Sequence, residues 1–322
     1  MHNSWDLKAD LTEKIKKNGG WINCHLHLDR AYTITPQSLH LADKTLKEKW
    51  DLVDEVKRSS SINQIYDRMA FGIEEMISQG VSALCSFIDV DDVVKDKSMI
   101  AAERVREKYK KDIVIKYANQ ALKGVIEPKA YEWFLRGSEF VDIIGGLPGR
   151  DKGHEEEHLD VLFLTAKRLN KMVHVHVDQF NSPSENETEL LVKKTLEHHM
   201  SGKVVAIHGI SIGAHSLEYR TKLYTCMKEA NIMLITCPTA WIDSRRNEVL
   251  TPTHNSIVPV EELIANDLIV GIGTDNIADI YKPFTDGSLW MELRFLLESC
   301  HYYDMKNLLL IATKNGRKIL GM

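Results

Sequence analysis

The 322-residue chain is long enough for one large domain or two ordinary ones. Hydrophobic residues make up 43% of it and charged residues 27%, the balance of a soluble globular protein with a sizeable core. With 41 Lys and Arg against 46 Asp and Glu, the formal net charge is -5, so charge favours neither nucleic acid nor an anionic membrane as a partner, and we expect a small-molecule substrate.

The start of the chain and its cysteines bear on the compartment. Residues 1–20 contain no apolar run like that of a signal peptide, and no segment approaches the ~18 apolar residues of a membrane span. These features predict a cytoplasmic protein. The cysteines are scattered, odd in number and without a CxxC pair, so we expect neither a disulfide framework nor a cysteine zinc site.

Residues 1–20 predict one amphipathic helix, and eight short apolar runs follow it along the chain. These runs are rich in Val and Ile and nearly continuous, as expected of parallel strands that are buried on both faces. The eight predicted strands are residues 21–26, 81–88, 113–118, 141–146, 172–177, 204–208, 232–237 and 268–274.

Longer segments with helical periodicity separate these runs. In residues 154–170, apolar side chains recur at offsets of three and four and form one stripe: Leu159, Leu162, Phe163, Ala166 and Leu169. Similar segments are residues 63–79, 98–111, 187–200, 217–230 and 260–265. This alternation predicts an α/β fold, a (β/α)8 TIM barrel rather than the competing open doubly wound sheet. No linker is evident, so we predict a single domain over residues 1–322, with one or two helices after the last strand.

Titratable side chains gather at the carboxyl ends of the predicted strands, where barrels of this type carry their reactive groups. His25 and His27 are two positions apart on the first strand, so both imidazoles point to the same side. The other candidates at strand ends are His174, His176, Asp178, His208 and Asp275. Imidazole and carboxylate ligands with an open position for water are typical of hydrolytic zinc or iron sites.

Each of these features also has a purely structural interpretation. A lone HxH pair is a weak signal, His208 could be a core residue, and Asp275 could cap a helix. When the features are considered together, a purely structural interpretation requires that four separate strand ends carry such groups by accident. We therefore favour a metal site.

The motifs also have a family resemblance. The order of HxH, two single histidines and an aspartate resembles the amidohydrolase superfamily, and residues 25–30, HLHLDR, resemble the HxHLD signature of its cytosine deaminase-like branch. Gln120 falls where that branch has a substrate-binding glutamine. Residues 176–179, HVDQ, resemble its His-x-Asp-Glu segment, and His208 matches its other single histidine.

The resemblance implies one catalytic divalent ion, either Zn or Fe, with Mn as a further option. Its ligands would be His25, His27, His176 and Asp275. Members with two metals bridge them with a carboxylated lysine at the end of the fourth strand, but residues 145–149 contain no lysine and Lys152 lies further on. One ion is therefore expected.

Two departures from the family pattern affect the expected chemistry. The glutamate that serves the branch as proton shuttle is Gln179 here, and an amide can only hydrogen-bond. The small β-sandwich that flanks the barrel in the family is missing from the predicted elements. The first departure argues against deamination of cytosine by the usual route, and the second indicates a trimmed form or a fragment.

The remaining groups suffice for a hydrolytic mechanism. We expect the metal to activate a water, Asp275 to accept its proton, and His208 to stabilise the developing charge or protonate the leaving nitrogen. Gln120 and Gln179 would then orient a planar substrate, and Trp241 could wall its ring.

Other polar residues have supporting roles in this hypothesis. Asp29 is expected to hold a ligand imidazole by its other nitrogen, and His174 and Asp178 to lie just outside the ligands. Glu185, Glu187 and Glu189 could replace the lost glutamate, although an acidic, solvated helix start is the simpler interpretation. Arg245 and Arg246 could meet an anionic group, although a solvated charge pair is the default.

The sequence thus predicts a metal-dependent hydrolase that cleaves C–N bonds, other than peptide bonds, in a small cyclic amide, amidine or aminated heterocycle. The alternatives are a cytosine-like deaminase with a modified proton shuttle, and a catalytically reduced barrel that binds metal and ligand. A homo-oligomer is compatible with the sequence, which does not determine the oligomeric state.

Overall fold

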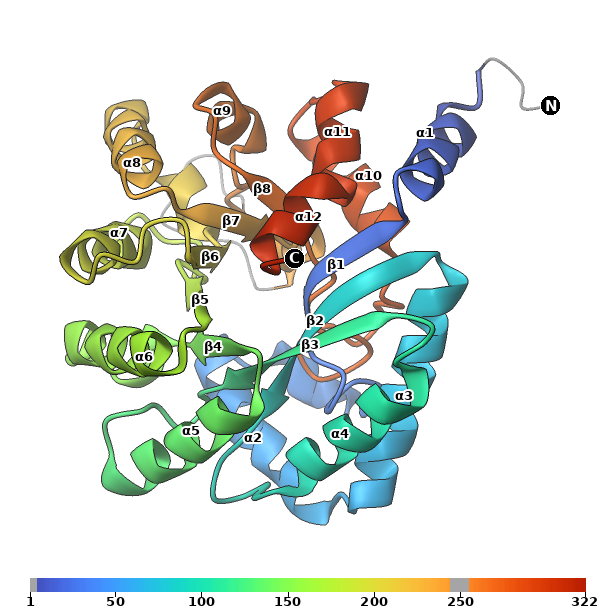
Figure 1. Cartoon of the computed structure of the whole chain (residues 1–322), viewed down its shortest axis with the longest axis vertical. Helices are drawn as coiled ribbons and strands as arrows, with labels where there is room; N and C mark the ends of the chain where they lie inside the picture. The colour runs from blue at the N-terminus through green and yellow to red at the C-terminus, as the bar shows by residue number, and fades with distance from the viewer. Residues whose placement is uncertain (1–4, 244–254) are drawn as a thin grey trace.

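The computed structural model describes residues 5–243 and 255–322, in which strands and helices alternate around a barrel (Figure 1). Eight parallel strands form one sheet in chain order, and a parallel bridge between Leu26 and Asp275 joins its two ends. The strands are β1 Trp21–Leu26, β2 Val81–Asp89, β3 Val114–Gln120, β4 Ile143–Gly146, β5 Met172–Val177, β6 Val204–His208, β7 Met233–Thr236 and β8 Val270–Ile272. The predicted (β/α)8 barrel is confirmed.

Most helices lie where the periodicity predicts them. They are α1 Leu7–Lys17, α2 Leu46–Ser59, α3 Ile62–Ser78, α4 Lys97–Tyr109, α5 Pro128–Phe140, α6 Glu155–Leu169, α7 Glu187–Glu197, α8 Leu217–Glu229, α9 Val260–Ala265, α10 Leu289–Ser299, α11 Met305–Ala312 and α12 Lys314–Ile319. The prediction of one or two helices after the last strand was wrong, because three follow β8. The predicted helices did not include α2 and α5.

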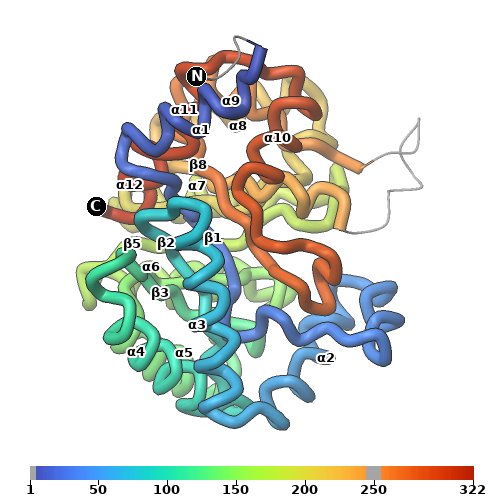
Figure 2. The backbone as a smooth tube through the Cα atoms, turned by 90° about the vertical axis from the view of Figure 1, so that its right-hand side faces the viewer, coloured from blue at the N-terminus to red at the C-terminus, as the bar shows by residue number. Residues whose placement is uncertain are grey.

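Helix α2 lies in the long connection between β1 and α3, and its ends are well defined. Thr45 and Glu48 form a capping box at its start, with the Thr45 side chain accepting from the Glu48 backbone and the Glu48 carboxylate accepting from the Thr45 backbone. Trp50 and Val53 are buried on one face. Figure 2 shows α2 and α12 at opposite ends of the barrel.

Two apolar clusters form the core. The larger one fills the space between the strands and the surrounding helices, and the smaller one is built around α2. The buried members of the smaller cluster are Trp50, Val53, Leu122, Leu147, Ile280 and Tyr281. These residues come from α2 and from segments that follow β3, β4 and β8, so the smaller cluster covers the carboxyl ends of the strands.

Close packing within the sheet explains one glycine of β4. A Cβ atom at Gly145 would lie 2.0 Å from the carbonyl oxygen of Asn119 and 2.7 Å from the ring of Phe87. Only glycine therefore fits between β3 and the side chains inside the barrel.

The described part of the chain holds no second sheet, since all eight strands belong to the barrel. Within the same residues, no helix is both long and apolar enough to cross a membrane. The single-domain assignment and the cytoplasmic location stay predictions.

Candidate active site

Three histidines from two strands meet at the carboxyl end of the barrel. His25 lies near the end of β1 and His27 directly follows the strand, two positions on, so both imidazoles lie on the inner side; His176 lies near the end of β5. One ring nitrogen from each of the three lies within 4.8 Å of those of the other two. All three residues are buried.

Asp275 joins this group from the segment after β8. Its backbone N–H donates to the carbonyl oxygen of His25 at 2.9 Å, and its φ of 57° is in the left-handed region. The chain approaches β1 closely here, since a Cβ at Gly273 would lie 2.7 Å from the same oxygen. This packing places Asp275 Oδ1 3.3 Å from His25 Nε2 and 3.2 Å from His27 Nε2.

His208 ends β6 beside this group. Its backbone φ is 75°, and a nitrogen of its ring lies within 4.8 Å of ligand atoms of both His25 and Asp275. The ring centroid lies 5.4 Å from that of His176. Its Nδ1 is buried and has no hydrogen-bond partner. His208 is therefore within reach of anything bound between the other histidines.

The donor atoms fit a divalent transition metal ion. His176 Nδ1 lies 3.1 Å from the carbonyl oxygen of Gly146, an acceptor only, so Nδ1 carries the proton and Nε2 keeps its lone pair. That Nε2, although buried, has no hydrogen-bond partner. Imidazole nitrogens and a carboxylate oxygen are the ligands that zinc and iron prefer.

The protonation states also fit metal binding. Burial lowers the pKa values of His27 and His176 well below the usual range and that of His208 to about 3, so these rings are neutral. Burial acts to raise the pKa of Asp275, but the Lys282 ammonium and the neighbouring imidazoles outweigh it and hold that pKa well below its usual range. Neutral imidazoles and an ionised carboxylate are the forms that bind metals.

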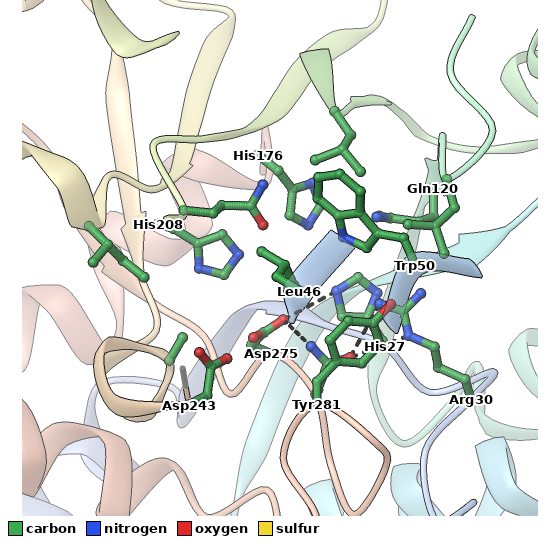
Figure 3. Close-up of a pocket in the computed structure, with 16 residues that line it drawn as sticks. His27, Arg30, Leu46, Trp50, Gln120, His176, His208, Asp243, Asp275 and Tyr281 are labelled. Atoms are coloured by element: carbon green, nitrogen blue, oxygen red, sulfur yellow. Dashed lines mark hydrogen bonds and ion pairs between the residues drawn. The ribbon is translucent and has the colours of Figure 1, made fainter. Parts of the chain in front are cut away.

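His27, His176, His208 and Asp275 line a small cavity at the carboxyl end of the barrel (Figure 3). Figure 3 shows His27, His176, His208 and Asp275 facing a common space, with Gln120 and Trp50 on one side and Asp243 on the other. Apolar parts of the wall are Leu46, Trp50, Leu122, Leu147, Ile210 and Ala240. The cavity thus combines a polar base with apolar walls, as small-molecule sites commonly do.

Both predicted substrate-binding glutamines line this cavity. Gln120 ends β3, and its Oε1 is buried without a hydrogen-bond partner. Gln179 follows β5, three residues after His176. The structure therefore brings Gln120, Gln179 and His208 into the lining of the same cavity as His176.

Trp241 lies apart from these residues. It is buried in the larger apolar cluster, where its ring packs 6.2 Å from that of Phe295, and it is not among the residues that line the cavity. The aromatic side chains in the cavity wall are Trp50 and Tyr281 instead.

Asp29 does not hold a ligand imidazole, so that expectation was wrong. Its Oδ2 accepts from the backbone N–H of Asp89 at 2.7 Å and from Ser98 Oγ at 3.1 Å. The atom that orients the His176 imidazole is the carbonyl oxygen of Gly146. A backbone group supplies this contact, so no side-chain motif could have indicated it.

His174 and Asp178 have structural contacts outside the cavity. His174 Nε2 lies 3.1 Å from the carbonyl oxygen of Ile319, in α12, and burial lowers the pKa of this imidazole to about 3. The Asp178 carboxylate accepts from the backbone N–H groups of Glu187 and Thr188, which begin α7. Both residues are two positions from His176 in the sequence, and neither lines the cavity.

The three glutamates after β5 do not form a uniformly solvated helix start. Glu185 accepts from the backbone N–H of Phe180 and from the Ser211 hydroxyl, and burial raises its pKa to about 7. Glu187 accepts from the backbone N–H of Asp178, and burial raises its pKa to about 8. Glu189 alone is exposed. None of them lines the cavity, and Arg245 and Arg246 lie outside the described residues.

Several cavity residues were not among the predicted site residues. Arg30 lies in the HLHLDR segment itself, and its guanidinium donates to Asp89 at 3.2 Å and to Asn276 at 3.2 and 3.3 Å. Arg30 ends the HLHLDR segment and Asn276 follows Asp275, so their positions beside these motifs could have indicated them. Among the remaining ones, Leu46, Trp50, Asp243 and Tyr281 reach the cavity through loops and α2, for which the sequence has no comparable signal.

Comparisons with known proteins agree with this geometry. The sequence model of the amidohydrolase family matches residues 19–322. An uncharacterized protein of Haemophilus influenzae is 55% identical over 262 residues, which are 80% of this chain and 95% of that protein. The N-isopropylammelide isopropyl amidohydrolase of Pseudomonas sp. strain ADP is 22% identical over 312 residues, 94% of this chain and 74% of that one. Among solved structures, 5-methylcytosine deaminase from Klebsiella pneumoniae, liganded with 5-fluorocytosine, has the same fold, with 23% identity and a TM-score of 0.87 over 94% of this chain and 74% of that one.

Proposed function

Because the chain belongs to the amidohydrolase family, we propose that it is a metal-dependent hydrolase of small cyclic amides, amidines or aminated heterocycles. The predicted resemblance to the amidohydrolase superfamily and its cytosine deaminase-like branch is confirmed, and the chain is a hydrolase that acts on C–N bonds other than peptide bonds. The substrate class is our proposal. It is supported by the small size of the cavity and by the planar amide groups of Gln120 and Gln179 in its wall.

The observation that carries the proposal is the meeting of buried potential ligand atoms at the carboxyl end of the barrel. Those of His25, His27 and His176 lie within 4.8 Å of one another, and Asp275 Oδ1 lies 3.3 Å from His25 Nε2 and 3.2 Å from His27 Nε2. We propose that His25, His27, His176 and Asp275 hold one divalent ion, either zinc or iron, with manganese as a further option. The two candidate ligand groups of the described residues share His25, which favours one ion over two. When bound, the ion lowers the pKa of a water molecule toward neutrality.

The protein's own groups would do the rest of the chemistry. Asp275, ionised through its contact with Lys282, can accept a proton at a carboxylate oxygen. His208 is a neutral imidazole and therefore has one N–H to donate to charge that develops on the substrate. Gln120 Oε1 is buried without a hydrogen-bond partner and can accept from an N–H of the substrate. The Gln179 amide can hydrogen-bond to the other edge of the substrate and orient it.

Metal removal tests this function. We expect the purified protein to contain about one transition metal ion per chain, as a single site requires. Chelator treatment should abolish hydrolysis of cyclic amides and aminated heterocycles, and zinc or ferrous iron should restore it. The histidine His198, which contacts Asp160 on the outside of the barrel, supplies a control, because His198→Asn should keep the ion. Stable metal-free protein that takes up neither ion would contradict the proposal, whereas metal-loaded protein without hydrolase activity would favour the catalytically reduced barrel.

The second candidate function, a deaminase with a modified proton shuttle, is favoured by the place of Gln179 in the cavity wall. We expect Gln179→Glu to raise deamination of cytosine-like rings by about 10²-fold or more, because a carboxylate can pass the proton that an amide cannot. The measurement is ammonia release from cytosine and 5-methylcytosine by both forms. Gln120→Glu, which adds a carboxylate elsewhere in the wall, is the matched control. Rapid deamination by the wild type would instead show that the amide suffices.

A further inference from the structure

A buried lysine touches the proposed metal ligand Asp275 from the side away from the histidines. Lys282 follows β8 by ten residues and is 3% exposed. Its Nζ lies 3.3 Å from Asp275 Oδ2 and donates to the carbonyl oxygen of Thr274 at 3.3 Å. Removing an ammonium group from water is costly, so a buried lysine needs partners that recover the cost.

Two further side chains hold this ammonium in place. Lys282 Nζ donates to Thr239 Oγ1 at 2.9 Å, and Thr239 Oγ1 in turn donates to Glu292 Oε1 at 2.6 Å. The other oxygen of Glu292 accepts from the backbone N–H of Thr239 at 2.8 Å. Glu292 is itself 3% exposed and comes from α10, and Thr239 comes from the 3-10 helix η4 Pro238–Ile242. The chain of contacts therefore ties three separate segments to one carboxylate.

The two carboxylate oxygens of Asp275 have different partners. Oδ1 faces His25 Nε2 and His27 Nε2 and accepts from Asn276 Nδ2 at 3.1 Å. Oδ2 faces Lys282. A carboxylate that chelates a metal must turn both oxygens toward it, and Lys282 opposes that rotation because it would lose its anionic partner.

We propose that Lys282 is a positioning residue that restricts Asp275 to one oxygen, Oδ1, on the metal side and so keeps a coordination position open for water. This inference rests on the proposed function. Thr239 and Glu292 act through Lys282 by holding its ammonium against Oδ2. Catalytic metal sites differ from structural ones in such an open position, so the arrangement has a direct consequence for hydrolysis.

The test uses the full chain, freed of metal and titrated with Co²⁺ alone, since the visible absorption of bound Co²⁺ weakens as ligands are added. In Lys282→Met, which keeps the length and removes the charge, we expect Asp275 to offer both oxygens and the absorption per bound ion to fall about twofold or more. Zinc affinity should change by about tenfold, toward tighter binding, because a nearby positive charge is gone.

A matched control separates this role from the loss of any buried lysine. Lys194 is 6% exposed and pairs with Asp160 between α6 and α7, outside the cavity. Lys194→Met should leave the Co²⁺ spectrum and zinc affinity as in the wild type. Equal spectra for the wild type and both methionine variants, even with a lower melting temperature for Lys282→Met, would make Lys282 a structural tie only and overturn the inference.

A second variant keeps the inference testable if Lys282→Met does not fold. Thr239→Val preserves the side-chain shape but removes the hydroxyl between Lys282 and Glu292. We expect a smaller change of the Co²⁺ spectrum in the same direction, and an unchanged spectrum overturns the inference. A wild-type chain that binds no Co²⁺ would contradict the proposed function itself, a failure distinct from identical spectra in metal-loaded variants.

Discussion

Asp275→Asn is expected to lower turnover by at least about 10³-fold. It should also weaken zinc binding by more than the loss of about 10–100-fold that is typical when a group outside the ligand set is mutated. The amide has nearly the shape of the carboxylate but lacks its charge, and Nδ2 could present a donor where Oδ1 now faces His25 and His27. The substitution thus removes the proposed metal ligand and the proposed general base together. The measurements are zinc titration against a chromogenic chelator and steady-state hydrolysis of a substrate found by screening.

Folding must be checked in the same experiment, because the substitution also leaves the Lys282 ammonium without its carboxylate partner. Losing one member of a buried ion pair is costly, so the melting temperature should fall. Asp267→Asn, at an exposed aspartate that pairs with Lys228, serves as the control and should behave as the wild type. A folded Asp275→Asn protein with wild-type zinc affinity would show that Asp275 is not a ligand.

The parts of the site that lie on strands could be predicted from the sequence. In parallel strands buried on both faces, side chains alternate with a period of two, so the spacing of His25 and His27 places both on the inner side. The strand boundaries at His176 and His208 then place these residues at the same end of the barrel. Regular geometry connects sequence to position directly in such cases.

Residues on irregular segments could not be placed in this way. Asp29 is only two residues after His27, but it turns to the backbone of Asp89 rather than to an imidazole. Trp50 reaches the cavity because α2 folds over the strand ends, a long-range contact that local pattern does not encode. The same limit applies to Trp241, which the sequence predicts in the cavity wall. It lies in the larger apolar cluster, and Trp50 and Tyr281 are the aromatic residues of the wall.

The contact of Lys282 with Asp275 shows this limit within the candidate metal site itself. The two residues are close in sequence, but a lysine seven positions after an aspartate has no preferred direction in a loop. Its ammonium is held by Asp275, by the Thr274 carbonyl oxygen and by Thr239, and the packing of α10 brings Glu292 to Thr239. Charges that tune a ligand therefore have to be read from tertiary structure.

His208→Asn is expected to retain the metal and lose most of the activity. Asparagine cannot transfer a proton as imidazole can, so turnover should fall by about 10²–10⁴-fold, the usual contribution of a positioned acid or base. Metal analysis and turnover are measured on the same preparation, with His198→Asn as the control outside the cavity. Both readouts are needed because ligand atoms of His208, His25 and Asp275 also lie within 4.8 Å of one another.

The two readouts distinguish three roles for His208. Loss of metal together with activity would make His208 a ligand, and the ion would then sit nearer the group of His25, His208 and Asp275 than that of His25, His27 and His176. Wild-type turnover in the variant would remove His208 from the mechanism. Metal retained with activity lost is the outcome that the neutral, buried and unpartnered imidazole leads us to expect, since its free nitrogen then serves the substrate.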